Sequence, residues 1–388
     1  MMSSSSAAAR GEKVPPCAWP RQAVVEEGLQ LGGNCTHRGT IPSKALRHAI
    51  QLLADYRHHP LFEHTLSAAE ISWPQLLHTS DQVISQQVSM LHRYYTRNHV
   101  HVFHGRGRFT DAHTLEVVNL DGSTQTLEAA QFIIATGSRP WRPAELDFSH
   151  PCIRDSDTLL DMDHTPRQVT IFGAGVIGCE YASIFANLDV KVNLVNTRDR
   201  LLSFLDDEVT DALSYHLRDQ GVLLHNEALG SVVADEQSVT LTCKSGRVIR
   251  SEILLWANGR SGNTTDMGLE ALGIEINSRG QIETNDRFQS SQEHIYAVGD
   301  VAGTGLGLLR PGTLRRHLYR RRQGGLALGG RSTHRHLHQP GNQLTGAHRS
   351  RADQTECPLR GRQGGIQEPG QGADIRPYHR YAEDPVPP

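Results

Sequence analysis

The sequence lacks closely spaced cysteines and clustered metal ligands. Its six cysteines are scattered, with no C-x-x-C pair and no group of His and Cys at zinc spacing. A disulfide-stabilised scaffold or a structural zinc site needs such pairs. The sequence therefore argues against both, and we predict no metal site.

Long apolar runs are also missing. No stretch reaches the roughly 18 apolar residues that a membrane-spanning helix needs. The N-terminal segment MMSSSSAAARGEK has no apolar region of the kind found in a secretory signal. We therefore expect a cytoplasmic protein with no membrane partner.

Lysine is absent after residue 303. Residues 304–388 contain 14 Arg and 6 acidic residues, a net charge of +8, whereas the whole chain has a net charge of -3. A basic tail on an acidic body is typical of a nucleic-acid-binding arm. The segment also has 14 Gly, 8 Pro, one Val and no Phe. So little apolar surface does not offset the entropy of ordering, and we expect a disordered tail.

Residues 22–303 contain alternating helix and strand patterns, which predict an α/β fold. The segment SWPQLLHTSDQVISQQVSMLHRYY reads as a helix with Ser72 as its N-cap. Asp121-Gly122 marks a hairpin turn between two strands. The apolar face expected for the helix comprises Leu76, Leu77, Val83, Ile84, Val88, Leu91 and Tyr95.

A glycine motif, Gly173-x-Gly175-x-x-Gly178, follows the apolar strand VTIF and precedes a helix. In this context the first glycine permits a tight turn, the second lets the backbone approach a pyrophosphate, and the third lets helix and strand pack closely. The N-terminus of the helix then binds phosphate. The motif predicts a dinucleotide site.

The next strand, VKVNLV, ends in Asn196 rather than in the acid that would bind the free ribose hydroxyls of NAD. Arg198 and Arg200 follow. A neutral residue beside guanidinium groups accepts a 2′-phosphate without excluding a hydroxyl, so we predict binding of NADP(H) and also of NAD(H). The competing interpretation is that both arginines are solvated loop charges.

Fragments of a second nucleotide site are also visible. The strand AVVEE ends in an acid, Glu26 or Glu27, placed to bind an adenosine ribose. The strand in IIATGSRP ends at Thr136-Gly137, where the backbone can touch a dinucleotide. The segment IYAVGD ends in Asp300, a suitable partner for a polyol hydroxyl.

Together, GGNCTHRGTIPSK, ATGSRP, GAGVIGCEYAS, NGR and YAVGD resemble the flavin-dependent pyridine nucleotide-disulfide oxidoreductases, relatives of glutathione reductase and lipoamide dehydrogenase. The resemblance covers residues 22–303. It implies two Rossmann-like domains, one for FAD and one for NAD(P), with Gly259 of the NGR motif in the NAD(P) site. It further implies that Lys44 lies near the flavin and pairs with Glu180, and that Gly32, Gly33 and Cys35 approach the flavin.

Redox loops of this family carry two cysteines, whereas this loop has Cys35 and then Thr40. Thiol–disulfide exchange needs the second thiol. Within the family, NCTHRGTIPSKALRHA and NTRDRLLSFLDDE look closest to the soluble pyridine nucleotide transhydrogenases. The resemblance therefore implies hydride transfer from NADPH to NAD⁺ by way of FAD, impaired in this chain. The alternatives are an inactive nucleotide-binding remnant and, more weakly, a disulfide reductase.

The chain departs from the family at both ends. Family members are homo-oligomers. They have a GxGxxG motif before the strand that corresponds to AVVEE and an interface domain after the segment that corresponds to YAVGD. This sequence has neither the motif nor the domain at these places. Read one base later, suitable codons for HLHQPGNQLTG (336–346) yield IYTSPEISSLG, and the following segments continue like the interface domain. In another frame KVPPCAWPRQA yields GAAMRMAKAG, like the missing helix. This favours out-of-frame translation over a nucleic-acid arm.

The expected organisation follows from these segments. The domain boundaries that we predict are an aberrant N-terminus at 1–21, the first part of an FAD-binding domain at 22–152, an NAD(P)-binding domain at 153–270, a return segment of the FAD-binding domain at 271–303 and an out-of-frame tail at 304–388.

Overall fold

The computed structural model of the chain describes residues 6–9, 22–57 and 71–303. All of them belong to one compact unit, Met1–Gly325. The second unit, Leu326–Pro388, and the whole basic segment 304–388 lie outside the described residues, so the predicted disorder of that segment stays a prediction.

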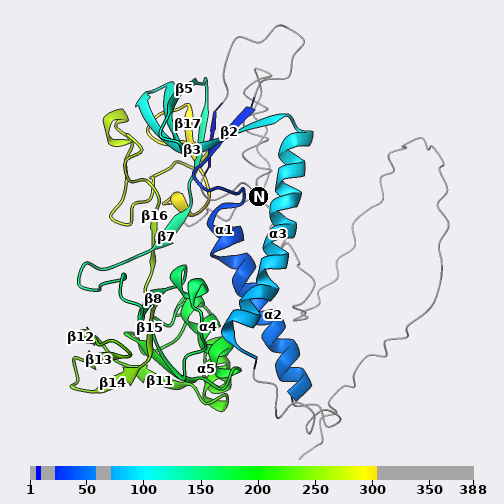
Figure 1. The fold of residues 1–388 in the computed structure, drawn as a ribbon. Coiled ribbons are helices and arrows are strands. Elements are labelled where there is room, and N and C mark those ends of the chain that lie inside the picture. Colours follow the sequence, from blue (N-terminus) through cyan, green and yellow to red (C-terminus); the bar gives the residue numbers. More distant parts are fainter. Residues whose placement is uncertain (1–5, 10–21, 58–70, 304–388) are drawn as a thin grey trace, which may run out of the picture. The chain divides into compact units, whose positions relative to one another are not determined.

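The first sheet has seven strands in the order β17-β6-β1-β2-β3-β4-β5. Its strands β2, β3, β5 and β17 are labelled in the upper part of Figure 1. Strands β17, β6, β2 and β3 run parallel to one another, and β3, β4 and β5 form an antiparallel extension. Gly122, with φ of 82°, lies in the predicted turn between β4 and β5. The strands are β1 (Ser6–Ala9), β2 (Gln22–Glu26), β3 (Val100–Asp111), β4 (Thr114–Asn119), β5 (Thr124–Glu128), β6 (Phe132–Ala135) and β17 (Ile295–Ala297).

Strand β1 is the exception in the parallel part of the first sheet. It lies between β2 and β6 and is antiparallel to both, with Ser6 opposite Glu26 and Ala9 opposite Ala23. We expected the folded part of the chain to begin near residue 22, and the structure differs here. A Ser-Ala-Ala-Ala segment has low strand propensity. Its place in the sheet depends on main-chain pairing with two neighbours, which any sequence can supply.

The second sheet has five strands, all parallel, in the order β11-β10-β9-β15-β8. Nearly all residues of β9, β10 and β15 are buried, as expected for strands covered on both faces, although β10 includes the buried Asn193 and Asn196. Its strands are β8 (Ile153–Asp155), β9 (Gln168–Phe172), β10 (Lys191–Asn196), β11 (Leu223–Asn226) and β15 (Ile253–Trp256), and its helices are α4 (Val176–Ala186) and α5 (Asp207–Asp219).

Two smaller sheets complete the strand inventory of the described residues. An antiparallel sheet follows β11 in the chain, and a two-stranded ribbon connects the first and second sheets. They consist of β12 (Leu229–Ala234), β13 (Val239–Cys243) and β14 (Val248–Ser251), and of β7 (Ser138–Pro140) and β16 (Arg260–Gly262). The 3₁₀ turns are η1 (Thr158–Asp161), η2 (Glu270–Leu272) and η3 (Gly299–Val301).

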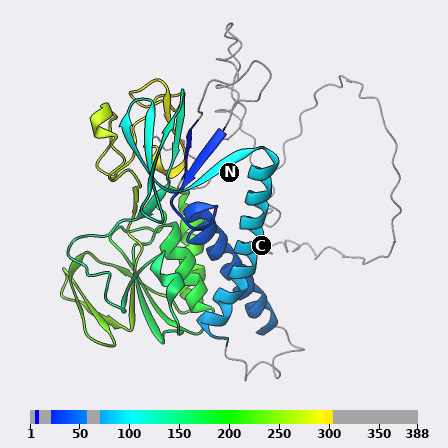
Figure 2. The same cartoon turned by 45° about the horizontal axis from the view of Figure 1, so that its top comes forward.

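Between β2 and β3, the described residues form the helices α1 (Gly33–His37), α2 (Thr40–Arg57) and α3 (Trp73–Arg97). Helix α3 confirms the predicted helix and its start, because the Ser72 backbone N–H donates to the Gln75 side chain at 2.8 Å. Helices α2 and α3 run side by side in both orientations (Figures 1 and 2). None of the helices in the described ranges is long and apolar enough to cross a membrane.

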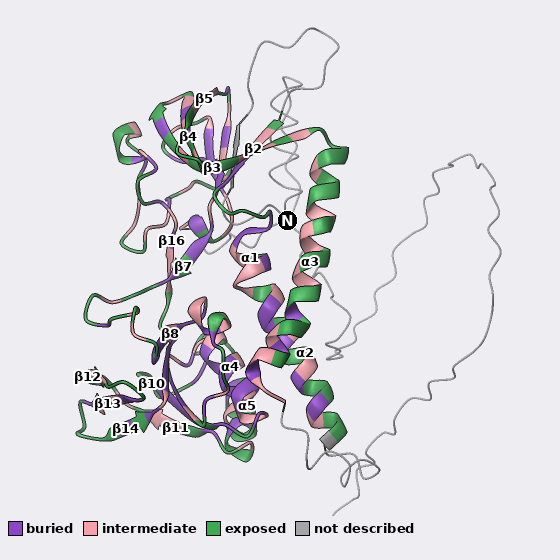
Figure 3. Cartoon of the chain, viewed as in Figure 1, coloured by how far each residue is buried: buried purple, intermediate pink, exposed green. Residues whose placement is uncertain are grey.

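The core of the second sheet extends into these helices. Trp73, fully buried at the start of α3, stacks on Phe185 of α4 with ring centroids 4.9 Å apart. Its indole nitrogen donates to the Leu159 carbonyl at 3.3 Å. Leu46 and Ile50 of α2 belong to the same cluster. Figure 3 shows that the buried residues of α2 and α3 occupy one side, while the opposite side is exposed.

Candidate functional site

The glycine turn after β9 has the geometry that the motif predicts. Gly173 has φ of 110°, and a Cβ there would lie 2.7 Å from the Ala257 carbonyl. A Cβ on Gly178 would lie only 1.9 Å from the Gly173 carbonyl oxygen. Gly175 differs, because a Cβ there would meet nothing within 4 Å. The first and third glycines are thus required by packing, whereas the space above the second is open, as a bound pyrophosphate would need.

The loop after β10 lies against this turn. The Leu202 N–H donates to the Ala174 carbonyl at 3.2 Å. Buried Asn196 shapes the loop, because its side-chain amide donates to the carbonyls of Arg198 and Arg200 at 2.7 and 2.8 Å. The arginine carbonyls are therefore fixed near the turn, while the Arg198 side chain remains exposed.

The two arginines of this loop have different partners. Arg198 donates to the Ser203 hydroxyl at 2.5 Å. Arg200 forms an ion pair with Asp207, in the first turn of α5. The hydrogen bond and charge of Arg200 lower the pKa of Asp207. A neutral hydroxyl leaves the Arg198 charge available for an anion, whereas a carboxylate compensates the charge of Arg200.

Gly259 follows β15 and has φ of 104° with open space around its Cα. Its carbonyl accepts from the Trp141 N–H at 3.1 Å. The preceding strand is hydrogen-bonded to the strand that leads into the glycine turn. Gly259 therefore lies at the same edge of the second sheet as Gly173 and Asn196.

At the first sheet, the carboxyl ends of β2, β6 and β17 meet at one edge. Glu26, fully buried, ends β2 and accepts from the Gly28 N–H at 3.2 Å, whereas Glu27 is exposed. Of the two acids, Glu26 is the one that the strand holds in the sheet. Ligands of open α/β sheets bind outside this edge.

The other two strand ends carry the remaining expected residues. Thr136 donates to the Asn263 carbonyl at 2.6 Å, and Gly137 has φ of 71°. Asp300, in η3, accepts from the Ser138 hydroxyl at 2.8 Å. The structure thus brings Thr136, Gly137 and Asp300 to the edge that also carries Glu26.

Strand β1 runs away from this edge. Because it is antiparallel to β2 and β6, its carboxyl end, at Ala9, lies at the opposite edge of the sheet. The predicted aberrant segment is described only over these four residues, and 10–21 lie outside the described part. The residues present thus fit the ribose and ring ends of FAD, but β1 does not lead into a phosphate-binding turn where one is needed.

The redox-type loop leads from β2 into α2. Gly32 has φ of 123°, and a Cβ there would collide with the Thr36 side chain at 2.6 Å. Gly33, with φ of 55°, begins α1. Both glycines are buried, and Cys35 in α1 is exposed. Glycine at 32 is therefore required by the turn itself, independently of any ligand.

Thr40 and Lys44 lie in the first part of α2. Thr40 begins the helix, and Lys44 donates to the Glu180 carboxylate of α4 at 2.6 Å. The Glu180 side chain is 11% exposed and that of Lys44 55% exposed. The pair joins α2 to the helix of the glycine turn. The resemblance had implied this pairing, and the structure contains it.

The cysteines of the described ranges give no disulfide. Cys35, Cys152, Cys179 and Cys243 are all free, and only Cys35 is exposed. Burial raises the pKa of Cys179 to about 11. A thiol so protonated is a poor nucleophile. This disfavours Cys179 as a substitute redox partner. Within the same ranges no cluster of three or more His, Cys, Asp or Glu suits a metal ion.

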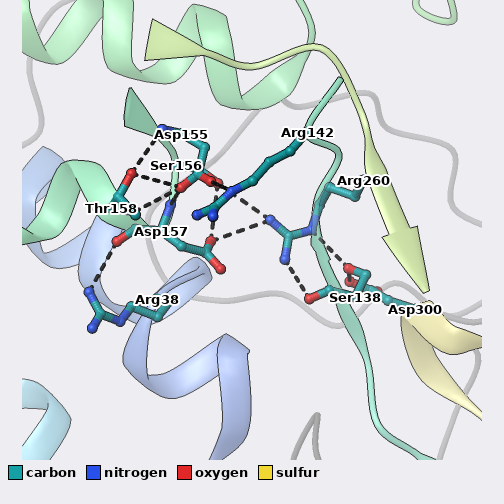
Figure 4. A network of polar contacts seen from close by, with 9 residues as sticks. All are labelled: Arg38, Ser138, Arg142, Asp155, Ser156, Asp157, Thr158, Arg260 and Asp300. Carbon is teal, nitrogen blue, oxygen red and sulfur yellow. Dashed lines mark hydrogen bonds and ion pairs between the residues drawn. The ribbon is translucent and has the colours of Figure 1, made fainter. Parts of the chain in front are cut away.

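Sequence reasoning missed a polar network beside this loop. It joins Arg260 of β16 to Ser138 and to Asp157, and Arg142 to buried Asp155 (Figure 4). Arg260 stands next to the NGR glycine, and that proximity was the available signal. Asp155 and Asp157 do not belong to any of the motifs named above, so no local sequence pattern indicated their role.

Comparison with known proteins agrees with this geometry. The family model described as pyridine nucleotide-disulphide oxidoreductase matches residues 19–323. A soluble pyridine nucleotide transhydrogenase of Azotobacter vinelandii (strain DJ / ATCC BAA-1303) is 52% identical over 282 residues, 72% of this chain and 61% of that protein. The protein of the same name from Escherichia coli O9:H4 (strain HS) is 50% identical over 284 residues, 73% of this chain and 61% of that protein.

Solved structures show the same fold. The flavoprotein disulfide reductase RclA from Escherichia coli matches with a TM-score of 0.65 and 25% identity, over 78% of this chain and 65% of that one. LpdA from Mycobacterium tuberculosis matches with a TM-score of 0.71 and 25% identity, over 79% and 67%. The chain spans about three fifths of the curated relatives that it matches. With its glycine turn, its Lys44–Glu180 pair and its matches over most of its length, the chain belongs to the pyridine nucleotide-disulphide oxidoreductase family.

Proposed function

We propose that the chain carries the site of an FAD-dependent transhydrogenase, which moves hydride between NADPH and NAD⁺. The observation that carries this proposal is Thr40 at the start of α2, where a second redox cysteine would have to stand. Cys35 has no partner sulfur in this loop, so hydride has no disulfide to reduce. The relatives named soluble pyridine nucleotide transhydrogenase support the same activity.

In this proposal the residues of the chain bind and orient the reactants. The turn at Gly173–Gly178 holds the nucleotide pyrophosphate at the start of α4, and Arg198 faces the 2′-phosphate of NADP(H). Glu26 and Asp300 bind hydroxyls of FAD, and Thr136-Gly137 lies against it. FAD, when bound, supplies a ring that takes up and returns hydride.

The Lys44–Glu180 pair supplies fixed charge near that ring. The Glu180 carboxylate, mostly buried, holds the Lys44 ammonium at 2.6 Å. A positive charge so fixed stabilises negative charge that develops next to it. The balanced reaction is NADPH + NAD⁺ ⇌ NADP⁺ + NADH, with each nucleotide using the same glycine turn in succession.

The test is a hydride-transfer assay with added FAD. NADPH and an NAD⁺ analogue with a distinct absorbance should give slow turnover, as expected for an impaired FAD site, whereas NADPH with oxidised glutathione or lipoamide should give no rate above the oxidase background. A Cys35→Ala variant should behave like the parent. Sustained disulfide reduction that Cys35→Ala abolishes would contradict the proposal.

A second candidate is a flavin-free nucleotide-binding protein. The reversed direction of β1 favours it, because no phosphate-binding turn stands among the described residues at the edge that carries Glu26 and Asp300. The second sheet keeps its complete glycine turn in either case. NADP⁺ binding to a purified chain with no flavin absorbance, even after incubation with FAD, would select this candidate.

A further inference from the structure

Arg260 lies in the ribbon that connects the two sheets. Strand β7 leads from β6 of the first sheet towards β8 of the second, and β16 leads back from β15. The two strands are paired, with Arg260 opposite Pro140. The Arg260 side chain is 22% exposed and points into the polar network of Figure 4.

On the side of the first sheet, the Arg260 guanidinium forms two hydrogen bonds with Ser138. Its Nε donates to the Ser138 hydroxyl at 2.8 Å, and its Nη2 donates to the Ser138 carbonyl at 2.7 Å. The Ser138 hydroxyl in turn donates to Asp300 at 2.8 Å. The guanidinium therefore fixes both the strand end after Gly137 and the Asp300 carboxylate.

On the side of the second sheet, the same guanidinium faces the turn after β8. Its Nη1 lies 3.6 Å from the Asp157 carboxylate and 3.4 Å from the Ser156 hydroxyl. Burial raises the pKa of Asp157, and the Arg260 charge opposes that rise. Asp155 lies beside it, fully buried, with a second arginine, Arg142, as its partner. Arg260 thus offsets part of the cost of burying the Asp157 charge.

The redox-type loop joins the same network. With its amide oriented to satisfy both ends, Asn34 donates to Asp157 at 3.3 Å and accepts from the Arg260 Nη2 at 2.6 Å. Arg38, at the end of α1, donates to the Asp157 carbonyl at 3.1 Å and to Asp161. The loop that carries Cys35 is therefore held against the second sheet on both sides of the cysteine.

We propose that Arg260 is a positioning residue that sets the distance and orientation between the two dinucleotide sites. It ties Ser138 and Asp300 of one site, through Asp157, to the sheet that forms the other site, and it holds the loop of residues 32–38 between them. Hydride transfer needs the two reacting groups in contact and aligned, and a shift of about 1 Å costs much of the rate. This inference rests on the proposed function, because it assumes that both sites serve one reaction.

The test compares three variants of the full chain by amide hydrogen exchange. Arg260→Gln removes the charge, and Arg260→Lys keeps the charge but not the paired donors. Arg250→Gln is the matched control, because Arg250 of β14 donates to Ser238 at 2.9 Å and to Asp235 at 3.3 Å, both in the turn between β12 and β13 of the same small sheet. NADP⁺ affinity is measured for each variant by titration.

We expect Arg260→Gln to speed exchange at residues 32–38 and 155–158 by about tenfold or more, as expected for the loss of several charge-assisted bonds. Arg260→Lys should restore the exchange protection of residues 155–158, because Lys keeps the ion pair with Asp157. It should not restore the protection of residues 32–38, because Lys loses the hydrogen bonds to Ser138 and Asn34. NADP⁺ affinity should change less than about twofold, because the side-chain partners of Arg260 are Asn34, Ser138, Ser156 and Asp157, and none of them belongs to the Gly173–Gly178 turn. Arg250→Gln should leave both segments unchanged.

Two results would overturn the inference. One is unchanged exchange at both segments in Arg260→Gln. The other is a uniform rise across the whole described chain, which would mean that Arg260 only adds stability. Should Arg260→Gln fail to fold, the segment pattern of Arg260→Lys decides between the same outcomes. Failure of the parent chain to bind NADP⁺ would instead contradict the proposed function, and the exchange of the unliganded variants would still report on Arg260.

Discussion

The first and second sheets share a parallel α/β plan but differ at the strand that matters most for phosphate binding. In the second sheet, β9 is parallel to its neighbours and leads through Gly173 into α4. In the first sheet, β1 is antiparallel to its neighbours and ends at the opposite edge. A phosphate site needs a turn and a helix N-terminus at the carboxyl edge of the sheet. Among the described residues only the second sheet has both, because β9 ends at that edge and β1 ends at the opposite one.

The two sheets also differ in which helices contribute to their hydrophobic cores. The hydrophobic cluster of the second sheet includes Leu46, Trp73 and Leu76 from α2 and α3. The first sheet has a separate cluster around Phe109, Phe132 and Ile134. Helices that follow β2 in the chain thus contribute to the core of the second sheet, which is not closed by its own helices alone.

The largest expected effect concerns FAD retention. Replacement of residues 1–21 by the in-frame translation predicted above should supply a parallel strand with a glycine turn. We expect the chain as it stands to purify without flavin absorbance and the replaced chain to retain FAD. The measurement is the ratio of flavin to protein absorbance after gel filtration. Equal flavin content in both chains would contradict the proposed difference in phosphate binding between the first and second sheets.

A large effect on stability should follow from Trp73→Ala. Truncation of a buried Trp costs about 3–5 kcal/mol, and here it also leaves the Leu159 carbonyl without the indole donor. Denaturant unfolding monitored by circular dichroism measures the change. Trp141→Ala is the control, since Trp141 is 43% exposed. A similar loss for both variants would mean that the shared core does not join the two halves.

Substitutions of two glycines in the turn after β9 should affect stability and nucleotide binding separately. Gly178→Ala places a methyl group against the Gly173 carbonyl, and overpacking of this kind costs about 1–3 kcal/mol or more. Gly175→Ala meets no protein atom within 4 Å, so stability should be kept while NADP⁺ binding weakens. Thermal unfolding and NADP⁺ titration of the two variants provide the comparison. Unchanged NADP⁺ affinity in Gly175→Ala would show that no pyrophosphate lies above this residue.

The smallest effect is expected in the loop after β10. Arg198→Ala should weaken NADPH binding more than NADH binding, by about 1.5–3 kcal/mol for a lost charge-assisted contact. Arg200→Ala should have a smaller effect, because Asp207 already compensates that charge. Parallel titrations with both nucleotides measure the difference. If Arg198→Ala weakens both nucleotides equally, Arg198 does not bind the 2′-phosphate.

Much of the site was predictable because its chemistry is local. The conformation of Gly173, the turn at Gly122 and the start of α3 at Ser72 each depend on a few consecutive residues. The Lys44–Glu180 pair came from the family resemblance, since nothing in the spacing of 136 positions indicates it. Trp73 was not predicted as a core residue, because its packing partners Tyr181 and Phe185 lie on another element.

The sequence by itself determined the glycine turn, the neutral Asn196 after β10 and the single cysteine of the redox-type loop. Each follows from residue identity at fixed spacing, so no long-range information is needed. Tertiary structure alone decided the direction of β1, the shared core at Trp73 and the convergence of Asn34, Ser138, Asp157 and Asp300 on Arg260. Strand pairing and long-range ion pairs depend on which distant segments meet, and the free energy that selects them is spread over the whole fold.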